Sequence, residues 1–355
     1  MDTWFGNAIV GWYRKNKRDL PWRQEKDAYK IWLSEIILQQ TQVIQGLSYY
    51  LKFIEKYPSV KHLAKAPEDE VLRLWQGLGY YSRARNLHAS AKLIQADFKG
   101  VFPSSYLEIK SLKGVGDYTA AAIASFAYNL PHAVVDGNVY RVLSRVFGIK
   151  TPIDASPAKK EFQELADSLL DRKTPAIYNQ AIMEFGSQCC RPAKPDCESC
   201  VLRNKCYAFK MSAVAEFPVK AKKTKIRNRY FNYVLLADRN KDILIHKRSE
   251  GDIWQGLYEF NLIETDAPVS QEQLVKLREF KAIAQQKSGL KYVSKEYKHI
   301  LSHQHLYAKF YVVNKRALTA AAKNQLKVNV GKLTKYAFPR LIGKFLDDCH
   351  LKEIL

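Results

Sequence analysis

Two acidic residues lie in surroundings that indicate acid–base chemistry. Glu35 stands inside an apolar stretch, 29–44, that reads as a largely buried helix. Burial raises the pKa of a carboxyl group because it disfavours the charged form, and a raised pKa suits a general acid that works near neutral pH. Asp136 stands between Val135 and Gly137. Plainer interpretations stay open: an exposed Glu on the polar face of an amphipathic helix, and an Asp-Gly turn.

Four cysteines with the spacing C-x6-C-x2-C-x5-C bring four thiol groups within seventeen residues: Cys190, Cys197, Cys200 and Cys206. Four thiolates this close in sequence can enclose one metal centre. Zinc is one candidate, since ligand type alone does not exclude it, although the two separate C-x2-C pairs of a common zinc ribbon are missing. Cys189 is adjacent to a ligand and Cys349 is isolated, so neither belongs to the set.

A glycine-rich turn lies between two helical patterns. Gly114 and Gly116 separate a short helix, which Ser104 or Ser105 can cap, from a run of small helix formers at 119–127. Glycine tolerates backbone angles that a Cβ forbids, and it lets a ligand approach closely. The amides that open the second helix would then bind an anion such as a phosphate. A simple bend between two core helices is the alternative.

The composition indicates a polyanionic partner. The 355-residue chain carries a formal net charge of +22, with 47% hydrophobic and 26% charged residues. This is a globular composition, long enough for two or three domains, and its charge attracts nucleic acid first and a membrane surface second. No apolar run reaches the ~18 residues of a spanning helix, and the first residues lack the layout of a signal peptide. We therefore expect a cytoplasmic protein with reduced cysteines and no membrane partner.

Two further stretches have residue types that contact DNA. The polar run 39–42 is unusual for a core helix, and its amide side chains can pair with base edges. Within 77–87, two glycines bracket Leu78, and Arg83 and Arg85 follow. This pattern suits a tight turn that pushes an apolar side chain into the duplex and places arginines near phosphates. An exposed helix end and a corner with buried tyrosines are the respective alternatives.

The hairpin with Gly114 and Gly116, the helix of small residues after it and Asp136 together resemble the helix-hairpin-helix DNA glycosylase superfamily, in which the hairpin grips DNA backbone. The segments 33–43 and 77–87 are similar to those of the adenine DNA glycosylase (MutY) family. That family removes adenine mispaired with 8-oxoguanine. The resemblance implies a multi-domain α plus α/β fold. An all-helical, two-lobed glycosylase domain with a 4Fe–4S loop would precede a Nudix-like α/β domain.

The resemblance also implies a role for each matching residue. Glu35 would protonate the leaving adenine. Asp136, in a polar loop beside Asn138, would stay ionised and stabilise the positive charge that develops on the sugar. The residues implied around the opposite, oxidised base are Gln40, Thr41 and Leu78, and those implied around the adenine are Arg18, Trp22, Arg23, Leu38, Tyr118 and Glu184.

Tyr118 separates two kinds of mechanism. Bifunctional relatives such as endonuclease III carry a lysine at this position of the hairpin, and its amine attacks the sugar to form a Schiff base. A tyrosine cannot do this. The sequence therefore predicts a monofunctional glycosylase, in which water near Glu35 and Asp136 is the nucleophile once the base has left the stack.

The four cysteines match the 4Fe–4S loop of the same superfamily, so the resemblance implies one 4Fe–4S cluster held within 190–206. The basic residues of this loop indicate contact with DNA backbone more than redox chemistry. A basic run follows within 210–229, with no acid after Pro218. We predict that this stretch is a linker that lies along phosphates.

Beyond the linker the pattern changes to strands. Residues 230–248 predict a hairpin of two strands, and the segment that follows resembles a Nudix-type domain. The helical stretch 271–289 lacks the metal-binding R-E-x-x-E-E-x-G motif of Nudix hydrolases, so pyrophosphatase activity is not expected. Ser302 and His303 match the family loop that recognises 8-oxoguanine, although Leu301 stands where an aromatic residue is usual.

The sequence thus predicts three parts: a helix-hairpin-helix glycosylase domain at 1–209, the basic linker at 210–229 and a Nudix-like 8-oxoguanine recognition domain at 230–355. The first hypothesis is a monomeric, monofunctional adenine glycosylase of base excision repair, acting on double-stranded DNA with adenine opposite 8-oxoguanine or guanine. A second hypothesis is a glycosylase for mismatched thymine or uracil, against which the recognition loop argues. A third is a non-catalytic mismatch binder, against which the pair of carboxylates argues.

Overall fold

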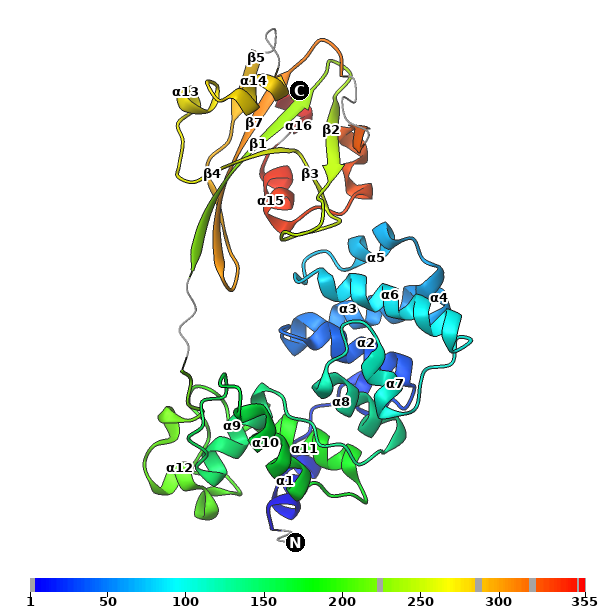
Figure 1. Ribbon diagram of the computed structural model, residues 1–355, viewed down its shortest axis with the longest axis vertical. Coiled ribbons are helices and arrows are strands. Elements are labelled where there is room, and N and C mark those ends of the chain that lie inside the picture. Colours follow the sequence, from blue (N-terminus) through cyan, green and yellow to red (C-terminus); the bar gives the residue numbers. More distant parts are fainter. Residues whose placement is uncertain (1–3, 222–225, 285–288, 319–323, 350, 355) are drawn as a thin grey trace. The chain divides into compact units, whose positions relative to one another are not determined.

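The computed structural model describes residues 4–221, 226–284, 289–318, 324–349 and 351–354 (Figure 1). The chain divides into two compact units. The first holds the chain up to Lys65 and from Asn86 into the linker, and the second holds Ala66–Arg85 and the chain after the linker. Within the described ranges no helix combines the length and the apolar character needed to cross a membrane.

The first unit is helical. Its elements are α1 (Trp4–Asn16), the 3-10 helix η1 (Pro21–Arg23), α2 (Ala28–Leu38), α3 (Val43–Lys56), α4 (Val60–Lys65), α7 (Tyr106–Ser111), α8 (Asp117–Tyr128), α9 (Gly137–Phe147), α10 (Ala158–Leu169), α11 (Pro175–Gln188), η2 (Arg203–Lys205), α12 (Tyr207–Lys210) and η3 (Val214–Glu216). Helix α5 (Glu68–Leu74) belongs to the second unit, and α6 (Ser82–Asp97) runs from the second unit into the first.

Local sequence explains where several of these helices start. Helix α7 begins after Ser105, whose hydroxyl accepts a hydrogen bond from the Glu108 amide while the Glu108 side chain accepts one from the Ser105 amide. This capping box satisfies amides that the first turn leaves unpaired, and it confirms Ser105 as the cap. Helix α9 begins after Asp136, whose side chain accepts a hydrogen bond from the Val139 amide. One of the predicted catalytic carboxylates is therefore also a helix cap.

The helices of the first unit form two groups. Helices α1, α9, α10 and α11 surround one hydrophobic cluster that includes Phe5, Phe162 and Phe185. Helices α2, α3, α7 and α8 lie together (Figure 1), and α8 is rich in small buried residues, Ala120, Ala121, Ala122 and Ala124. Small side chains let helices approach closely at interior packing density. Helix α8 also packs on α11, so the two groups meet along this pair.

The described residues of the second unit form a mixed eight-stranded sheet. Its strands are β1 (Arg227–Ala237), β2 (Asp242–Lys247), β3 (Tyr258–Glu259), β4 (Asn261–Thr265), β5 (Gly289–Val293), β6 (Tyr297–Ile300), β7 (Gln304–Asn314) and β8 (Gln325–Asn329). The strand order is β3-β2-β1-β7-β5, with β4 paired to β1, β6 to β7 and β8 to β2. Strands β1 and β7 run parallel along their full length. The helices are α13 (Gln271–Leu274), α14 (Arg278–Ala284), the 3-10 helix η4 (Val330–Lys335), α15 (Arg340–Asp348) and α16 (Leu351–Ile354).

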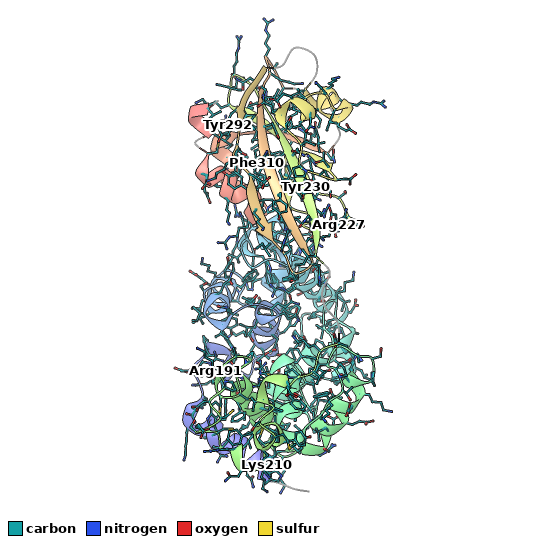
Figure 2. The ribbon with its side chains drawn as sticks, turned by 90° about the vertical axis from the view of Figure 1, so that its left-hand side faces the viewer. Arg191, Lys210, Arg227, Tyr230, Tyr292 and Phe310 are labelled. Atoms are coloured by element: carbon teal, nitrogen blue, oxygen red, sulfur yellow. The ribbon has the colours of Figure 1, made fainter. Side chains whose placement is uncertain are left out.

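Alternate residues of β1 serve opposite faces of this sheet. Phe231 and Tyr233 join a cluster on the α15 side that also holds Phe310, which is labelled in Figure 2. The ring of Phe310 stacks on that of Phe345 in α15, with the ring centroids 3.9 Å apart. Val234 and Leu236 join the cluster on the α14 side. Helices on both faces of the sheet explain why these strands are apolar on both faces. The predicted fold class, helical and then Nudix-like α/β, is confirmed, as is the hairpin of β1 and β2.

Two predicted boundaries differ from the structure. The single helix predicted at 271–289 is wrong: two short helices, α13 and α14, occupy its described part, β5 begins at Gly289, and 285–288 lie outside the described residues. In the predicted linker, 222–225 also lie outside the described residues. Strand β1 begins at Arg227, because its first residues pair with β7 through a register that the β1 sequence alone does not reveal.

Candidate active site

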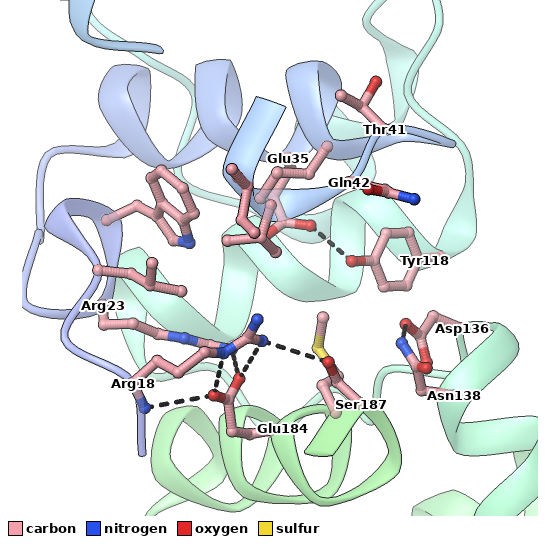
Figure 3. A pocket seen from close by; sticks show the side chains of 16 residues that line it. Arg18, Arg23, Glu35, Thr41, Gln42, Tyr118, Asp136, Asn138, Glu184 and Ser187 are labelled. Carbon is pink, nitrogen blue, oxygen red and sulfur yellow. Dashed lines mark hydrogen bonds and ion pairs between the residues drawn. The ribbon is translucent and has the colours of Figure 1, made fainter. Parts of the chain in front are cut away.

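A pocket of about 430 Å³ opens in the first unit between its two groups of helices (Figure 3). Sixteen side chains line it: Arg18, Leu20, Trp22, Arg23, Glu35, Leu38, Thr41, Gln42, Val43, Ile44, Tyr118, Asp136, Asn138, Met183, Glu184 and Ser187. Every residue predicted for catalysis or for the adenine pocket is among them. Folding therefore gathers residues from η1, α2, α8, α9 and α11 around one cavity.

Glu35 projects from α2 with only 6% of its surface exposed. Tyr118 on α8 donates a hydrogen bond from its Oη to Glu35 Oε2 at 2.6 Å (Figure 3). Burial raises the pKa of Glu35, although the Tyr118 hydrogen bond and the charge of Arg23 act in the opposite direction. Burial and the neighbouring carboxylates raise the pKa of Tyr118 well above its ordinary value, so the phenol stays the donor. The predicted buried position is confirmed, and the exposed alternative is wrong.

Asp136 caps α9 and lines the same pocket. Its Oδ1 accepts a hydrogen bond from the Val139 amide at 2.8 Å, and its Oδ2 accepts one from Asn138 Nδ2 at 2.8 Å. Burial raises the pKa of Asp136, while the hydrogen bonds from Val139 and Asn138 oppose that rise. Both carboxyl groups thus have raised pKa values. The expected difference in protonation, with Glu35 protonated and Asp136 ionised, rests on the larger number of hydrogen bonds that stabilise the ionised Asp136.

Arg141 is a contributor that the sequence reading missed. Its Nη2 donates to Asn138 Oδ1 at 2.8 Å, which fixes the amide so that the Asn138 NH2 group faces Asp136. The guanidinium also donates to the carbonyl oxygens of Gly186 and Cys190, at 2.7 Å each. The three-residue spacing between Asn138 and Arg141 along a predicted helix was the available signal.

Glu184 is fully buried at the base of the pocket. Arg18 donates to its two oxygens from Nε at 2.6 Å and from Nη2 at 2.9 Å, and Arg23 Nη2 donates at 2.7 Å. Burial acts to raise the pKa of Glu184, but the hydrogen bonds and charges of Arg18 and Arg23 outweigh it and lower the pKa. Arg18 also donates to Ser187 Oγ at 3.3 Å. These arginines are therefore not solvated surface charges, and they form an ion-paired wall of the pocket.

The polar run 39–42 forms a turn between α2 and α3. The prediction of one helix through Ile44 is wrong: α2 ends at Leu38, and Gln40 adopts the left-handed region with φ 54°. Thr41 lines the pocket, whereas Gln40 is exposed outside it. On the pocket wall near this turn, Leu38 lies beside α3, and the ring of Trp22 packs edge-on against Tyr50 at 5.2 Å. The turn exposes amide groups at the rim, as its polar composition indicated.

The glycine-rich hairpin joins α7 to α8 as predicted. Gly114 has φ 78°, and a Cβ there would lie 2.8 Å from the Cβ of Asn86, so only glycine fits without strain. Gly116 caps α8 in extended conformation and faces open space. In the described chain neither of their amides donates to a carbonyl of the turn. Asp117 opens α8 and is paired with Lys110 and Lys159, which lower its pKa to about 2.

The turn at 77–80 belongs to the second unit and differs from its prediction. Leu78 is 8% exposed, so it does not project as a free apolar tip in this structure. Arg83 is buried and donates to the carbonyl oxygens of Leu78 and Gly79 at 3.3 Å each. Arg85 donates to the Gln255 carbonyl at 2.5 Å. Both guanidinium groups are engaged inside the protein, which argues against their predicted contact with phosphates.

Ser302 and His303 form the exposed tip between β6 and β7. Tyr80, in the left-handed region with φ 46°, shares a hydrogen bond between its Oη and Ser302 Oγ. This contact links two segments predicted for the opposite base, within one unit. The sequence motif at 77–87 includes Tyr80, but neither a role for it nor this link was predicted. A bulky residue directly after Gly79 in a tight turn was the signal. Leu301, in place of the usual aromatic, packs against the sheet cluster on the α15 side.

The cysteine loop follows α11. The four spaced cysteines and Cys189 line one small cavity of about 20 Å³. Arg145 Nη1 donates to Cys190 Sγ and the Leu202 amide donates to Cys200 Sγ, at 3.4 Å each. N–H donors and a cation beside sulfur suit thiolates that hold an iron–sulfur cluster. Among the described residues, however, no three thiol, imidazole or carboxyl groups are arranged to hold a metal ion.

Comparison with known proteins adds the family context. Residues 33–168 match the model of the HhH-GPD superfamily of base excision DNA repair proteins, and residues 232–348 match that of the NUDIX domain. An adenine DNA glycosylase of Buchnera aphidicola subsp. Baizongia pistaciae is 32% identical over 352 residues, covering 96% of this chain and 95% of its own. The adenine DNA glycosylase of Mus musculus is 40% identical over 216 residues, covering 58% of this chain and 42% of its own.

Solved structures resemble somewhat more than half of the chain. A thermostable thymine-DNA glycosylase is 31% identical, with a TM-score of 0.55 over 58% of this chain and 95% of its own. Endonuclease III in a non-covalent DNA complex is 20% identical, with a TM-score of 0.52 over 59% of this chain and 95% of its own. The second likeness shows a shared fold. The sequence relatives extend the similarity across both units.

Proposed function

Because the chain belongs to the adenine DNA glycosylase family, within the HhH-GPD superfamily of base excision DNA repair proteins, we propose that it hydrolyses the N-glycosidic bond of adenine opposite 8-oxoguanine or guanine in double-stranded DNA. One observation carries the proposal: buried Glu35, hydrogen-bonded to Tyr118, shares one pocket with Asp136. The pocket volume lies in the ~300–1,000 Å³ range of ligand sites. Adenine reaches the pocket only after leaving the base stack.

Glu35 is the proton donor. Its Oε2 accepts the Tyr118 hydrogen bond, and among the described residues none donates to Oε1. The transferable proton therefore belongs on Oε1, where it is free to reach a ring nitrogen of the bound adenine. The raised pKa of Glu35 favours its protonated form, and protonation of the base makes it a better leaving group.

Asp136 stabilises the sugar. As the glycosidic bond breaks, positive charge develops on the sugar ring, and an ionised carboxylate opposite that charge lowers the barrier. The hydrogen bonds from Val139 and Asn138 hold the Asp136 oxygens in place before the reaction starts. A water molecule between this carboxylate and the sugar is then the nucleophile, as in glycoside hydrolysis by two carboxyl groups. Its oxygen bonds to the sugar carbon that loses adenine, and its proton passes to one of the two carboxylates, since Glu35 has given its own proton to the base.

The site supports a monofunctional reaction. None of the sixteen described residues that line the pocket is a lysine, and the hairpin position of the Schiff-base amine is occupied by Tyr118, whose hydroxyl is bound to Glu35. Without an amine at the sugar, no covalent imine forms, so strand cleavage requires alkali. The ion-paired Glu184 and the Trp22 ring are proposed to orient the adenine ring in the pocket.

Recognition of the opposite base is assigned to two exposed turns, one in each unit. In the first unit the turn bears Gln40 and Thr41. In the second unit the β6–β7 tip bears Ser302 and His303, joined to the Leu78 turn through Tyr80. Hydroxyl, amide and imidazole groups can read the altered hydrogen-bonding edge of 8-oxoguanine. The hairpin amides of Gly114 and Gly116 are proposed to bind backbone phosphate.

One 4Fe–4S cluster is proposed within the cysteine loop, with Cys190, Cys197, Cys200 and Cys206 as its ligands. The single cavity that these sulfurs share and the N–H donors beside them support this donor set. When bound, the cluster would fix the loop, because four ligands tie 190–206 to one centre. The reaction steps assigned to Glu35 and Asp136 do not pass through it.

Single-turnover base release tests this function. Duplexes would carry adenine opposite 8-oxoguanine, adenine opposite guanine, or thymine opposite guanine, with and without alkali. Wild type should release adenine, with strand breaks only after alkali, and should leave thymine in place. Glu35→Gln and Asp136→Asn should each slow adenine release by about 10²–10⁴-fold, the usual contribution of a positioned acid or base. Iron and acid-labile sulfide assayed on the same wild-type protein test the cluster.

Three outcomes would contradict the proposal. Tight mismatch binding without base release would mean a non-catalytic binder. Release of thymine rather than adenine would move the chain to the activity of the thymine-DNA glycosylase that it resembles in structure. Strand breakage without alkali would show that an amine outside the described pocket attacks the sugar.

A further inference from the structure

A buried ion-pair network lies beneath the β6–β7 tip in the second unit. Arg229 on β1 is buried, and all five of its N–H groups have an acceptor. It donates to Glu264 at 2.8 Å and 2.6 Å, to Asp252 at 2.7 Å twice, and to Gln304 Oε1 at 3.1 Å. Arg248 joins the network by donating to Asp252 Oδ2 at 2.5 Å. Arg229 is therefore not available to phosphates, in contrast with the prediction for the basic run.

The network is tied directly to the tip. Gln304, which accepts the fifth N–H of Arg229, is the first residue of β7 and follows His303 in the chain. The Leu301 amide donates to the Gln304 carbonyl at 2.8 Å, which closes the turn over Ser302 and His303. The Arg227 amide donates to the His303 carbonyl at 3.0 Å. The side chain of Arg229 and the backbone of its strand thus hold one side of the recognition tip.

Aromatic rings complete the support. The Arg229 guanidinium lies over the Phe231 ring at 4.8 Å, and Phe231 packs edge-on against Trp254 at 6.3 Å. Trp254 in turn contacts the ring of His299 on β6 at 5.7 Å. Strand β6, through His299, and strand β7, through Gln304, are therefore both linked by contacts to Arg229. Fixed side chains around a binding group are what keep it within the tolerance that recognition requires.

We propose that Arg229 is a positioning residue for opposite-base recognition: through Gln304 it fixes the tip that bears Ser302 and His303, and so sets how strongly the chain prefers 8-oxoguanine to guanine opposite adenine. This inference rests on the proposed function. Arg229 touches no substrate. Its influence passes through the orientation of two exposed side chains, one of which is also held by Tyr80.

The strand offers a matched control. Arg227 lies two residues before Arg229 (Figure 2), but its side chain is 72% exposed and its nearest carboxylate oxygen, on Glu264, is 3.8 Å away. Arg227→Met and Arg229→Met each remove one positive charge, so any general loss of attraction to DNA is the same. Gln304→Met is the gentler variant, because it cuts the link to the tip and leaves the pairs of Arg229 with Glu264 and Asp252 intact.

The experiment compares single-turnover adenine release opposite 8-oxoguanine and opposite guanine in the full chain. We expect Gln304→Met and Arg229→Met to lower the ratio of the two rates by about tenfold, within the ~10²-fold that a misplacement of about 1 Å can cost. Arg227→Met should leave the ratio unchanged. Near-ultraviolet circular dichroism at the assay temperature must match wild type for Gln304→Met, so that a change in ratio is not an unfolded second unit.

The outcomes separate this inference from the proposed function. If Ser302→Ala lowers the ratio and Gln304→Met does not, the tip recognises the base without help from Arg229, and the inference fails while the function stands. If Arg227→Met lowers the ratio as much as Arg229→Met, the effect is one of charge and the inference also fails. If wild type shows no preference between the two duplexes, the assignment of opposite-base recognition itself is wrong.

Discussion

At the scale of single residues, the pH dependence of base release reports on the contact between Glu35 and Tyr118. Only protonated Glu35 donates a proton, so the rate falls as pH rises through the pKa of Glu35. The Tyr118 hydrogen bond stabilises the carboxylate and lowers that pKa. Tyr118→Phe should therefore move the alkaline limb of the pH–rate profile to higher pH. The measurement is single-turnover adenine release across the pH range.

A second buried tyrosine serves as the control for this substitution. Tyr29 donates from its Oη to the Tyr57 carbonyl at 2.6 Å and does not line the pocket. Tyr29→Phe should leave the alkaline limb where it is. A shift of the limb to lower pH in Tyr118→Phe would contradict the role given to this hydrogen bond. The acid limb belongs to Asp136, whose stabilising charge is lost as pH falls through its pKa.

At the scale of elements, the hairpin between α7 and α8 makes opposite demands on its two glycines. Gly114→Ala places a Cβ 2.8 Å from that of Asn86 at a residue with φ 78°. We expect it to lower the free energy of unfolding by about 1–3 kcal/mol, the usual cost of such backbone strain. Gly116→Ala meets open space at an ordinary φ, so stability should not change while affinity for duplex DNA falls.

Thermal unfolding and DNA titration of the two variants check this expectation. The close approach of a phosphate to the hairpin is the reason for the loss of affinity at Gly116, since an added methyl group would occupy that space. If Gly116→Ala binds DNA as tightly as wild type, the hairpin does not hold a phosphate at this position. If Gly114→Ala is as stable as wild type, the steric argument at Asn86 is wrong.

Elements that depend on nearby residues were predictable from the sequence, and those that depend on distant ones were not. The Ser105 cap and the glycine hairpin follow from spacings within a few residues. The end of α2 at Leu38 was missed, because Gln40 adopts a left-handed conformation that its residue type does not indicate. The burial of Arg229 was missed because its partners lie beyond β2: the pairing of β1 with β4 brings Glu264 close, and the loop after β2 brings Asp252 close.

The same distinction applies to the candidate site. The residues predicted for catalysis and for the adenine pocket came from the family motifs, and the structure places all of them around one cavity. Arg83 was predicted to lie near DNA phosphates, whereas its guanidinium donates to carbonyl groups of its own turn. Composition alone cannot separate these two uses of arginine, because a buried arginine and a solvated one are the same residue with different partners.

At the scale of the whole molecule, part of the positive charge is bound inside the protein, and two separate segments of the chain form the second unit. The net charge of +22 is not all available to DNA, because arginines such as Arg229 and Arg145 are bound inside the protein. The chain itself enters the second unit twice, since Ala66–Arg85 groups with residues after the linker. The segment is fastened there by Lys247 and Tyr258, which contact Asp69, and by Gln255, which contacts Arg85.

A chain that ends at residue 221 should therefore be less stable than the intact protein, although the cut lies in the linker. Arg85 loses two hydrogen bonds to Gln255, and Asp69 loses Lys247 and Tyr258. The Lys247 pair is nearly half exposed and contributes little, so we expect a loss of about 1–3 kcal/mol, carried mainly by the other bonds. Calorimetry would show it as a melting temperature below the first transition of the full chain.

The control is full-length protein cut at 222–225 by a protease. Its fragments together keep the partners of Ala66–Arg85, so they should elute together and melt near the temperature of the intact protein. Equal melting temperatures for the truncated and intact chains would mean that this segment needs nothing from the second unit.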